Sequence, residues 1–319
     1  MNIIETHALS RVYGKRRAVD SLDMCVAAGE IYGFVGKNGA GKSTAMKMIA
    51  GLVRPTSGSV ELFGAQRRAR EGFSRVGALI EDPGVLPTFS ALENLMCKAL
   101  ALGVVRPNAH CRELLELVGL ADTGNLRVKK FSLGMKQRLG LALALVGGPD
   151  LLLLDEPFNG LDPESTRAMR GALVRLNRER GVTMVISSHV LDQLDRMATS
   201  FGVIRSGRMV RELSMDDLHR ECGNSIRIRT NDPARTLAIL EESLPGTALR
   251  AEPDGSILAS AAVRHAATSF GGAAVAPMAP SAEDVARALS EHGLLILELS
   301  HVERDIEEYF VELMGGADA

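Results

Sequence analysis

The stretch Gly36-Lys37-Asn38-Gly39-Ala40-Gly41-Lys42-Ser43-Thr44 decides the fold of this chain. It matches the pattern G-x-x-x-x-G-K-S, in which the backbone of a glycine-rich loop surrounds phosphate groups. The apolar run Ile31–Val35 predicts a strand before it, and residues 44–52 predict a helix after it. Because the glycines let successive N–H groups point inward, and the helix directs the positive end of its dipole at the same place, the stretch predicts a nucleotide-binding loop.

Two side chains of this loop carry chemistry. Lys42 can reach the β- and γ-phosphates of a nucleotide, and the hydroxyl of Ser43 can ligate Mg²⁺. The alternative is an accidental glycine turn before a helix, but here strand, loop and helix follow one another in the required order. The loop by itself indicates only that a nucleotide is bound.

Length and composition are those of an ordinary globular protein. The chain has 319 residues, enough for two domains, with 46% hydrophobic and 24% charged residues and a net charge of −2. Such a balance does not favour nucleic acid as a partner. The four cysteines at positions 25, 97, 111 and 222 show neither metal-site spacing nor a disulfide framework, which fits a reducing cytosol.

Neither a signal peptide nor a membrane span is expected. Met1–Glu5 lacks a basic segment followed by an apolar one. The most apolar stretch, Leu139–Leu154, is interrupted at Gly147-Gly148-Pro149-Asp150 and is too short to cross a bilayer. If the protein works at a membrane, we expect another subunit to supply the membrane part.

Strands alternate with helices up to about residue 218, which favours a mostly parallel α/β sheet. From residue 88 to residue 147 the apolar spacing becomes helical, which indicates a helical insert. The remaining elements expected in this part are strands within residues 2–30 and at 59–63, 76–80, 151–154, 182–187, 200–205 and 208–213, and helices at 164–180 and 190–197.

The composition changes near residues 216–224, and we expect residues 219–319 to form a small α+β accessory domain. Strands are expected at 225–230, 248–252, 256–261 and 294–300, and helices at 234–244, 282–292 and 303–313. The order βαββαβ predicts a ferredoxin-like sandwich. Residues 269–280, rich in Gly, Ala and Pro, have the least ordered pattern.

The run Leu151–Leu154 ends in two acids, Asp155 and Glu156. An apolar strand of a parallel sheet carries such carboxylates to the edge where ligands bind. Asp155 is then placed to bind Mg²⁺, and Glu156 to polarise a water that attacks the γ-phosphate. The alternative is a strand that ends at solvent with two surface acids.

A second anion site is predicted in the segment Phe131–Arg138, at the start of a helix. Ser132 and the N–H groups around Gly134 can bind a phosphate at the helix N-terminus. Taken alone, the segment is better explained as an ordinary helix cap by Ser132, and only its place among the other motifs favours the anion site.

In their order along residues 1 to about 215, these motifs resemble the ATP-binding subunits of ABC transporters. Gly36–Thr44 resembles the Walker A loop, Asp155-Glu156 the Walker B motif and Phe131–Met135 the signature motif. The resemblance implies a P-loop ABC cassette with a RecA-like core, an antiparallel β subdomain and a helical subdomain. It also implies ATP and Mg²⁺ as cofactors and ATP hydrolysis coupled to transport as the activity.

The resemblance also implies the site residues. Those that bind the nucleotide are Tyr13, which stacks on adenine, Gly36, Asn38, Gly39, Ala40, Gly41, Lys42, Ser43, Thr44 and Asp162 of the D-loop, with Ser132 and Gly134 supplied by a second subunit. The catalytic residues are Lys42, Glu81, Glu156 and His189 of the H-loop. The metal ligands are Ser43, Glu81 and Asp155.

Two departures from the family pattern narrow the resemblance. Glu81 stands where the family usually has the Q-loop glutamine, and Leu133 replaces a signature glycine. These segments look most like the bacitracin- and lantibiotic-resistance exporters. A glutamate near Mg²⁺ adds a negative charge that holds the metal more tightly and repels the γ-phosphate more strongly. Leu133 lacks the backbone freedom of glycine, which leaves Ser132 and Gly134 as the phosphate contacts.

The resemblance therefore implies the ATPase subunit of an exporter of peptide antibiotics. Two copies would bind two ATP molecules head to tail at the cytoplasmic face of the membrane, and a separate permease would dock near Asp82–Leu92. Nucleic acid is not expected as a partner. The segments at 294–299 and 305–314 are similar to those that close such subunits.

Alternatives remain open. In one alternative, the chain serves an exporter of small drugs, lipids or ions. In another, it is a soluble ABC ATPase without a transport role. One intact cassette without a long heptad run or basic tract disfavours the latter. The C-terminal domain is alternatively a ligand-sensing module.

Overall fold

The computed structural model describes residues 1–66, 75–222, 225–261, 280–302 and 306–315. Most of the stretch 269–280, for which the least order is expected, lies outside these residues, as do the first residues of the last expected helix. The chain divides into two units, Met1–Glu212 with Leu313–Gly315, and Leu213–Glu312. Within the described residues, no helix is long and apolar enough to cross a membrane.

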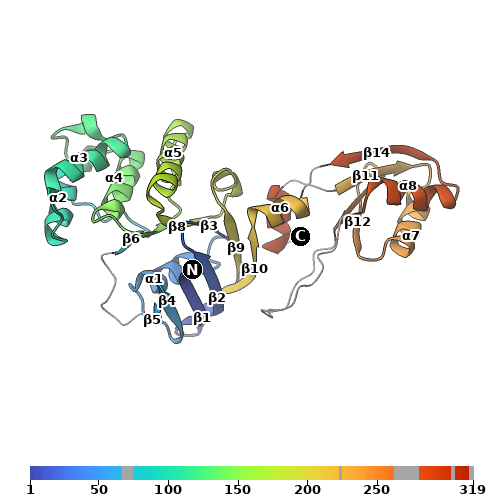
Figure 1. Cartoon of the computed structure of the whole chain (residues 1–319), viewed down its shortest axis with the longest axis horizontal. Coiled ribbons are helices and arrows are strands. Elements are labelled where there is room, and N and C mark those ends of the chain that lie inside the picture. Colours follow the sequence, from blue (N-terminus) through green and yellow to red (C-terminus); the bar gives the residue numbers. More distant parts are fainter. Residues whose placement is uncertain (67–74, 223–224, 262–279, 303–305, 316–319) are drawn as a thin grey trace. The chain divides into compact units, whose positions relative to one another are not determined.

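The first unit begins with an antiparallel sheet (Figure 1). Its strands are β1 (Asn2–Tyr13), β2 (Arg16–Ala27), β4 (Ser57–Leu62) and β5 (Ala65–Gln66), in the spatial order β2-β1-β4-β5. Alternate residues of the strands are buried, as the two-residue period of a half-exposed sheet requires.

A second sheet of the first unit carries the candidate site. Its order is β10-β9-β3-β8-β7-β6, and β3 pairs in parallel with β8 and β9, as β7 does with β6 and β8. Residues of β3, β7 and β8 are buried throughout, which explains their continuous apolar runs. The bounds are β3 Ile31–Val35, β6 Val76–Leu79, β7 Leu151–Asp155, β8 Thr183–Ser188, β9 Ser200–Arg205 and β10 Arg208–Ser214.

Helix α1 (Lys42–Ala50) joins the two sheets into one core. Its side chains Met46 and Ile49 are fully buried and belong to the same cluster as Leu9 of β1 and Leu153 of β7. The loop that precedes α1 is therefore held in place from both sheets. Helix α5 (Pro163–Arg180) follows β7 and buries Leu173.

Three helices form the insert, and Figure 1 shows them side by side. They are α2 (Ala91–Ala101), α3 (Pro107–Leu117) and α4 (Leu133–Leu145), with the short 3₁₀ turns η2 (Ala121–Thr123) and η3 (Val128–Lys130) between α3 and α4. The sequence sets where they begin: Ser90 and Glu93 form a capping box before α2, α3 has proline at its first position, and Ser132 caps α4.

The helix expected at residues 190–197 is not present as an α-helix. The structure has a single 3₁₀ turn, η4 (Leu191–Gln193). A local contact explains this difference. The hydroxyl of Ser188 accepts a hydrogen bond from the N–H of Val190 and donates one to the carbonyl oxygen of Val190, and this holds the backbone of Val190 in an extended conformation. Leu191, Leu194 and Met197 are buried at three-residue steps, a spacing that suits a 3₁₀ turn as well as an α-helix.

The second unit contains a four-stranded antiparallel sheet of order β12-β13-β11-β14. Helices α7 and α8 supply Leu240 and Leu289 to the core of this sheet, so that the elements follow the order βαββαβ of the split βαβ arrangement. Helices α6 (Met215–Cys222) and α9 (Ile306–Leu313) flank these elements in the sequence. The bounds are β11 Ser225–Thr230, α7 Pro233–Ser243, β12 Thr247–Ala251, β13 Ile257–Ala261, α8 Ala282–Glu291 and β14 Ile296–Val302.

Candidate nucleotide-binding site

The loop between β3 and α1 is shaped by glycine. Gly41 precedes α1 with φ at 113°, and within the described residues no side-chain hydrogen bond caps the start of the helix. A Cβ at Gly41 would lie 2.5 Å from the carbonyl oxygen of Ala18, so glycine is required for space as well as for conformation. The uncapped N–H groups are thus left for an anion.

Lys42 turns its ammonium back over this loop. Its side chain is 5% exposed, and Nζ donates to the carbonyl oxygen of Gly36 at 2.6 Å. Nζ also lies 3.4 Å from Glu156 Oε1. The cation is therefore fixed between the loop backbone and the acid that follows β7, where it can meet phosphate oxygens.

The acids after β7 are held by a serine of the neighbouring strand. In the register of β7 and β8, Asp155 lies opposite Ser187. The Ser187 hydroxyl donates to Asp155 Oδ1 at 2.5 Å and accepts from the N–H of Glu156 at 3.0 Å. Sequence reasoning missed Ser187. Its signal was the polar pair Ser187-Ser188 at the end of a buried strand, just before His189.

Glu156 has a left-handed backbone, with φ at 48°. Its Oε2 lies 2.9 Å from His189 Nδ1, so one carboxylate oxygen is held by the imidazole. Among the described residues its buried Oε1 has no hydrogen-bond partner, although the ammonium of Lys42 lies nearby. Glu156 is thus held at both oxygens, at Oε2 by His189 and at Oε1 by the charge of Lys42.

These groups border a cavity of about 370 Å³. It brings together many of the residues implied by the sequence motifs, and it adds Arg16 and Ala18, which sequence reasoning missed. Arg16 lies opposite Tyr13 where β1 turns into β2, and that pairing was not visible in the motifs. The lining residues are Tyr13, Arg16, Ala18, Asn38, Gly39, Gly41, Lys42, Ser43, Thr44 and Glu156.

Tyr13 is 45% exposed at the rim of this cavity. The Arg11 guanidinium lies 4.5 Å from the centroid of its ring, in the range of a cation–π contact. Arg11 therefore covers one face of the ring. Gly36 and Ala40 belong to the loop but do not line the cavity. Asp155 and His189 do not line it either; they adjoin Glu156, Asp155 in the sequence and His189 through its contact with Oε2.

Three further implied nucleotide ligands, outside the loop, do not line this cavity. Ser132 Oγ caps α4 by accepting from the N–H of Met135 at 3.2 Å, and Gly134 follows in the first turn of that helix. Asp162 caps α5, and hydrogen bonds from the backbone and side chain of Ser165 hold its pKa below the ordinary value. The structure thus places all three at the N-termini of other helices.

Glu81 also lies outside the lining of the cavity. Its side chain is 62% exposed and pairs with Lys47 of α1, and its backbone is left-handed with φ at 63°. Within the single chain the carboxylate is therefore placed against a lysine one turn beyond Ser43 and Thr44. An exposed pair of this kind is worth at most about 1 kcal/mol, so it opposes movement of Glu81 only weakly.

Comparison with known proteins identifies the architecture around this site. Residues 19–159 match the family model described as ABC transporter. Over 98% of its length the chain is 35% identical to the bacitracin transport ATP-binding protein BcrA of Bacillus licheniformis, of which 98% is covered. The chain belongs to the ABC transporter family.

Two further ABC proteins define the extent of the likeness. The lantibiotic transport ATP-binding protein SrtF of Streptococcus pyogenes is 38% identical over 67% of this chain and 92% of its own. A dimeric ATP-binding cassette solved in a post-hydrolysis state with ADP and Pi matches 66% of this chain and 98% of its own, with a TM-score of 0.62 and 22% identity. The fold is that of the ABC cassette, and the protein is an ATP-binding ABC ATPase, which confirms the resemblance to this family.

Proposed function

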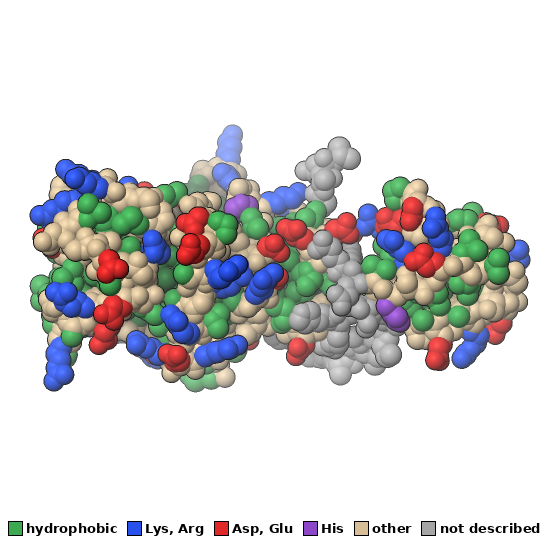
Figure 2. Space-filling view, turned by 90° about the horizontal axis from the view of Figure 1, so that it is seen from above, with side chains coloured by type: hydrophobic (Ala, Val, Ile, Leu, Met, Phe, Trp, Pro, Cys, Tyr) green, Lys and Arg blue, Asp and Glu red, His purple; other side chains and the backbone are tan. Residues whose placement is uncertain are grey.

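We propose that this ABC ATPase powers export of peptide antibiotics through a separate membrane permease, at the cytoplasmic face of the membrane. The observation that carries the proposal is the likeness to a bacitracin transport protein over 98% of both chains, including the second unit. On the face shown in Figure 2, acidic and basic side chains of the described residues are interspersed, which suits a protein partner better than nucleic acid.

The residues at the cavity fit Mg²⁺ together with a nucleotide. The hydroxyl of Ser43 and the carboxylate of Asp155 are hard oxygen donors of the kind that Mg²⁺ prefers. When bound, the ion would neutralise charge that develops on the transferred phosphoryl group. Ser187 fixes the carboxylate through Oδ1, and Lys42 and the uncapped N–H groups of α1 would hold the phosphates.

Glu156 is the proposed general base. Its Oε1, which lies 3.4 Å from Lys42 Nζ and accepts no hydrogen bond from the described residues, would accept the proton of the attacking water, while His189 holds Oε2 and so keeps the carboxylate directed at the phosphates. His189, which contacts Glu156, would also respond to the presence of the γ-phosphate. Tyr13 would stack on the base with the face opposite Arg11.

A second copy of the chain would complete the site. Ser132 and Gly134 do not line the cavity of their own chain and lie at the N-terminus of α4, where Ser132 is exposed. We propose that they contact the γ-phosphate bound to the other copy, so that ATP joins two cassettes and hydrolysis releases them. Glu81 would reach the metal after leaving Lys47.

The test is expression with the candidate permease in an antibiotic-sensitive host. Resistance to bacitracin or a lantibiotic that disappears with Glu156→Gln supports the proposal. Resistance only to small amphipathic drugs would instead assign the protein to drug export. Recovery of ribosomes, rather than a permease, with the tagged protein would overturn the transport function altogether.

A further inference from the structure

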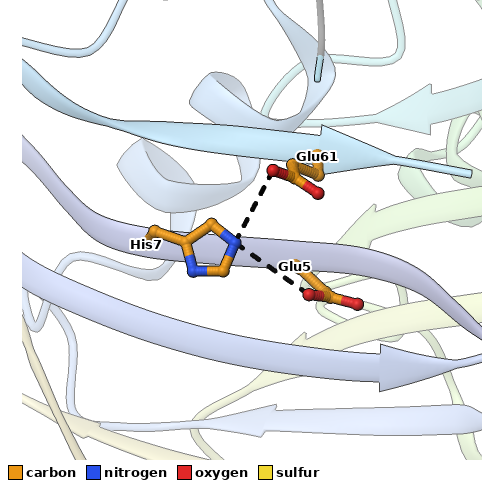
Figure 3. Close-up of side chains that lie close together, drawn as sticks. All are labelled: Glu5, His7 and Glu61. Carbon is orange, nitrogen blue, oxygen red and sulfur yellow. Dashed lines mark ion pairs between the residues drawn. The ribbon is translucent and has the colours of Figure 1, made fainter. Parts of the chain in front are cut away.

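Three ligand-type side chains gather on the exposed face of the antiparallel sheet, outside the nucleotide cavity (Figure 3). Glu5 and His7 are two residues apart on β1 and therefore point to the same side. The register of β1 and β4 places Glu61 opposite Glu5. The alternate residues Ile4, Thr6 and Leu62 are buried, so a packed sheet fixes the backbone positions of all three side chains.

The spacing of their polar atoms suits an ion between them. His7 Nε2 lies 3.9 Å from Glu5 Oε2 and 3.8 Å from Glu61 Oε1, too far for direct hydrogen bonds. One donor atom from each residue lies within 4.8 Å of the others. Zinc binds histidine nitrogen and carboxylate oxygen at about 2.0–2.2 Å, so two of its ligand atoms are commonly between 3 and 4 Å apart.

The charge around these side chains favours a cation. Within the described part of the chain, the ion pairs recorded for Glu5 and Glu61 are with His7, and neither carboxylate is neutralised by lysine or arginine. Glu5 also faces Cys25 of β2, and after burial the charges of Glu212, Glu5 and Glu30 raise the pKa of that thiol. This side of the sheet is therefore negative.

We propose that Glu5, His7 and Glu61 bind one divalent transition-metal ion of the zinc type. An imidazole with two carboxylates suits Zn²⁺, Co²⁺ or Ni²⁺ better than Mg²⁺ or Ca²⁺, which favour oxygen ligands alone. The three side chains are 40%, 55% and 35% exposed, which leaves a fourth position to water. Such an ion would tie β1 to β4 and stabilise the sheet that carries Tyr13.

Zn²⁺ titration by calorimetry tests the site, in a Cys97→Ser background because that exposed thiol competes for zinc. The protein is first stripped with chelator, and excess Mg²⁺ is present throughout. We expect one ion per chain and a higher thermal midpoint with zinc. His7→Ala should weaken binding by at least about 100-fold, because it removes a ligand, whereas loss of a residue that only orients a ligand costs about 10–100-fold. Co²⁺ in place of zinc should give a visible spectrum that His7→Ala abolishes.

The matched control is His301→Ala, which removes another exposed strand histidine, on β14, and should leave zinc affinity unchanged. Glu61→Gln keeps the shape of the site while removing one charge, so it separates loss of a ligand from misfolding. ATP binding and the metal-free thermal midpoint report whether each variant is folded. Undiminished zinc affinity in His7→Ala, or equal loss in His301→Ala, would overturn the proposal, as would the absence of a bound ion in the parent protein.

Discussion

Glu156 connects three separate parts of the site. It follows β7, contacts His189 after β8, and lies 3.4 Å from the ammonium of Lys42 at the start of α1. A left-handed backbone at a non-glycine residue is uncommon and costs energy, so the surrounding contacts must hold it in place. This geometry accounts for a carboxylate that is hydrogen-bonded to His189 at one oxygen and faces the Lys42 ammonium with the other.

The first prediction concerns Glu156 Oε1, the oxygen that faces Lys42. Glu156→Gln retains size and the contact with His189 but removes the proton acceptor, so turnover should fall by about 10²–10⁴-fold. ATP affinity should stay close to that of the parent, and the variant should accumulate as an ATP-bound dimer. Phosphate release, equilibrium nucleotide binding and gel filtration measure the three effects. Full ATPase activity would remove Glu156 as the base.

The second prediction concerns the buried hydroxyl of Ser187. Ser187→Ala removes the donor to Asp155 Oδ1 and leaves the N–H of Glu156 without its acceptor. Because residues that orient metal ligands typically affect metal affinity by 10–100-fold, the Mg²⁺ concentration for half-maximal activity should rise by about that factor. Ser200→Ala, which removes a strand hydroxyl bonded to Glu30, is the control. An unchanged Mg²⁺ dependence would show that Ser187 does not position Asp155.

At the level of elements, the N-terminus of α4 has two proposed tasks. Ser132 caps its own helix and is proposed to contact phosphate on a second copy. Ser132→Ala should therefore cost about 1 kcal/mol of stability and also abolish ATP-dependent dimerisation of Glu156→Gln. Ser281→Ala is the matched control, since this exposed serine caps α8 in the same way. It should cost similar stability and leave dimerisation intact; equal effects on dimerisation would refute the contact in trans.

Strand β10 carries an acid, Glu212, that is exposed at the protein surface but has a different consequence. Partial loss of water around its carboxylate raises the pKa of Glu212 above its ordinary value of 4.5, opposed by hydrogen bonds from the Tyr32 hydroxyl and the N–H of Cys25. The folded state thus binds the proton of Glu212 more tightly than the unfolded state does. Protonated Glu212 therefore contributes fully to the free energy of unfolding at low pH, and this contribution is lost as the pH rises through the raised pKa. Glu212→Gln should raise the thermal midpoint at pH 8 by more than at pH 4. A larger gain at pH 4 would contradict this effect of desolvation.

The elements that the sequence predicted well are those whose pattern has one explanation. β3 and β7 are continuous apolar runs buried on both faces, and the loop before α1 needs glycine at Gly41 for space. The α-helix predicted at residues 190–197 was wrong, because a hydrogen bond from the N–H of Val190 to the side chain of Ser188 determines the local backbone conformation. Arg16 and Ser187 could not be found from motifs, because pairing between strands brings each of them to the site.

At the scale of the whole molecule, the proposed permease must contact the cassette through an exposed surface. Leu86 is 45% exposed in the segment before α2, inside the range 82–92 expected to dock the permease. Leu86→Asp should abolish recovery with co-expressed permease and with membranes, while basal ATPase activity remains. Leu100→Asp changes a leucine that is 65% exposed at the other end of α2, and should have no effect. Recovery of the permease with Leu86→Asp would exclude this docking surface.

The start of α1 has a consequence for how fast the protein is degraded in the cell. Without a capping side chain, the first turn of this helix lacks about 1 kcal/mol that a serine or aspartate cap would add. Phosphate groups bound there would act as the missing cap, and ligand binding stabilises the folded state by mass action. Resistance to proteolysis should therefore follow the cellular ATP supply: a starved cell would degrade this subunit faster than a well-fed one.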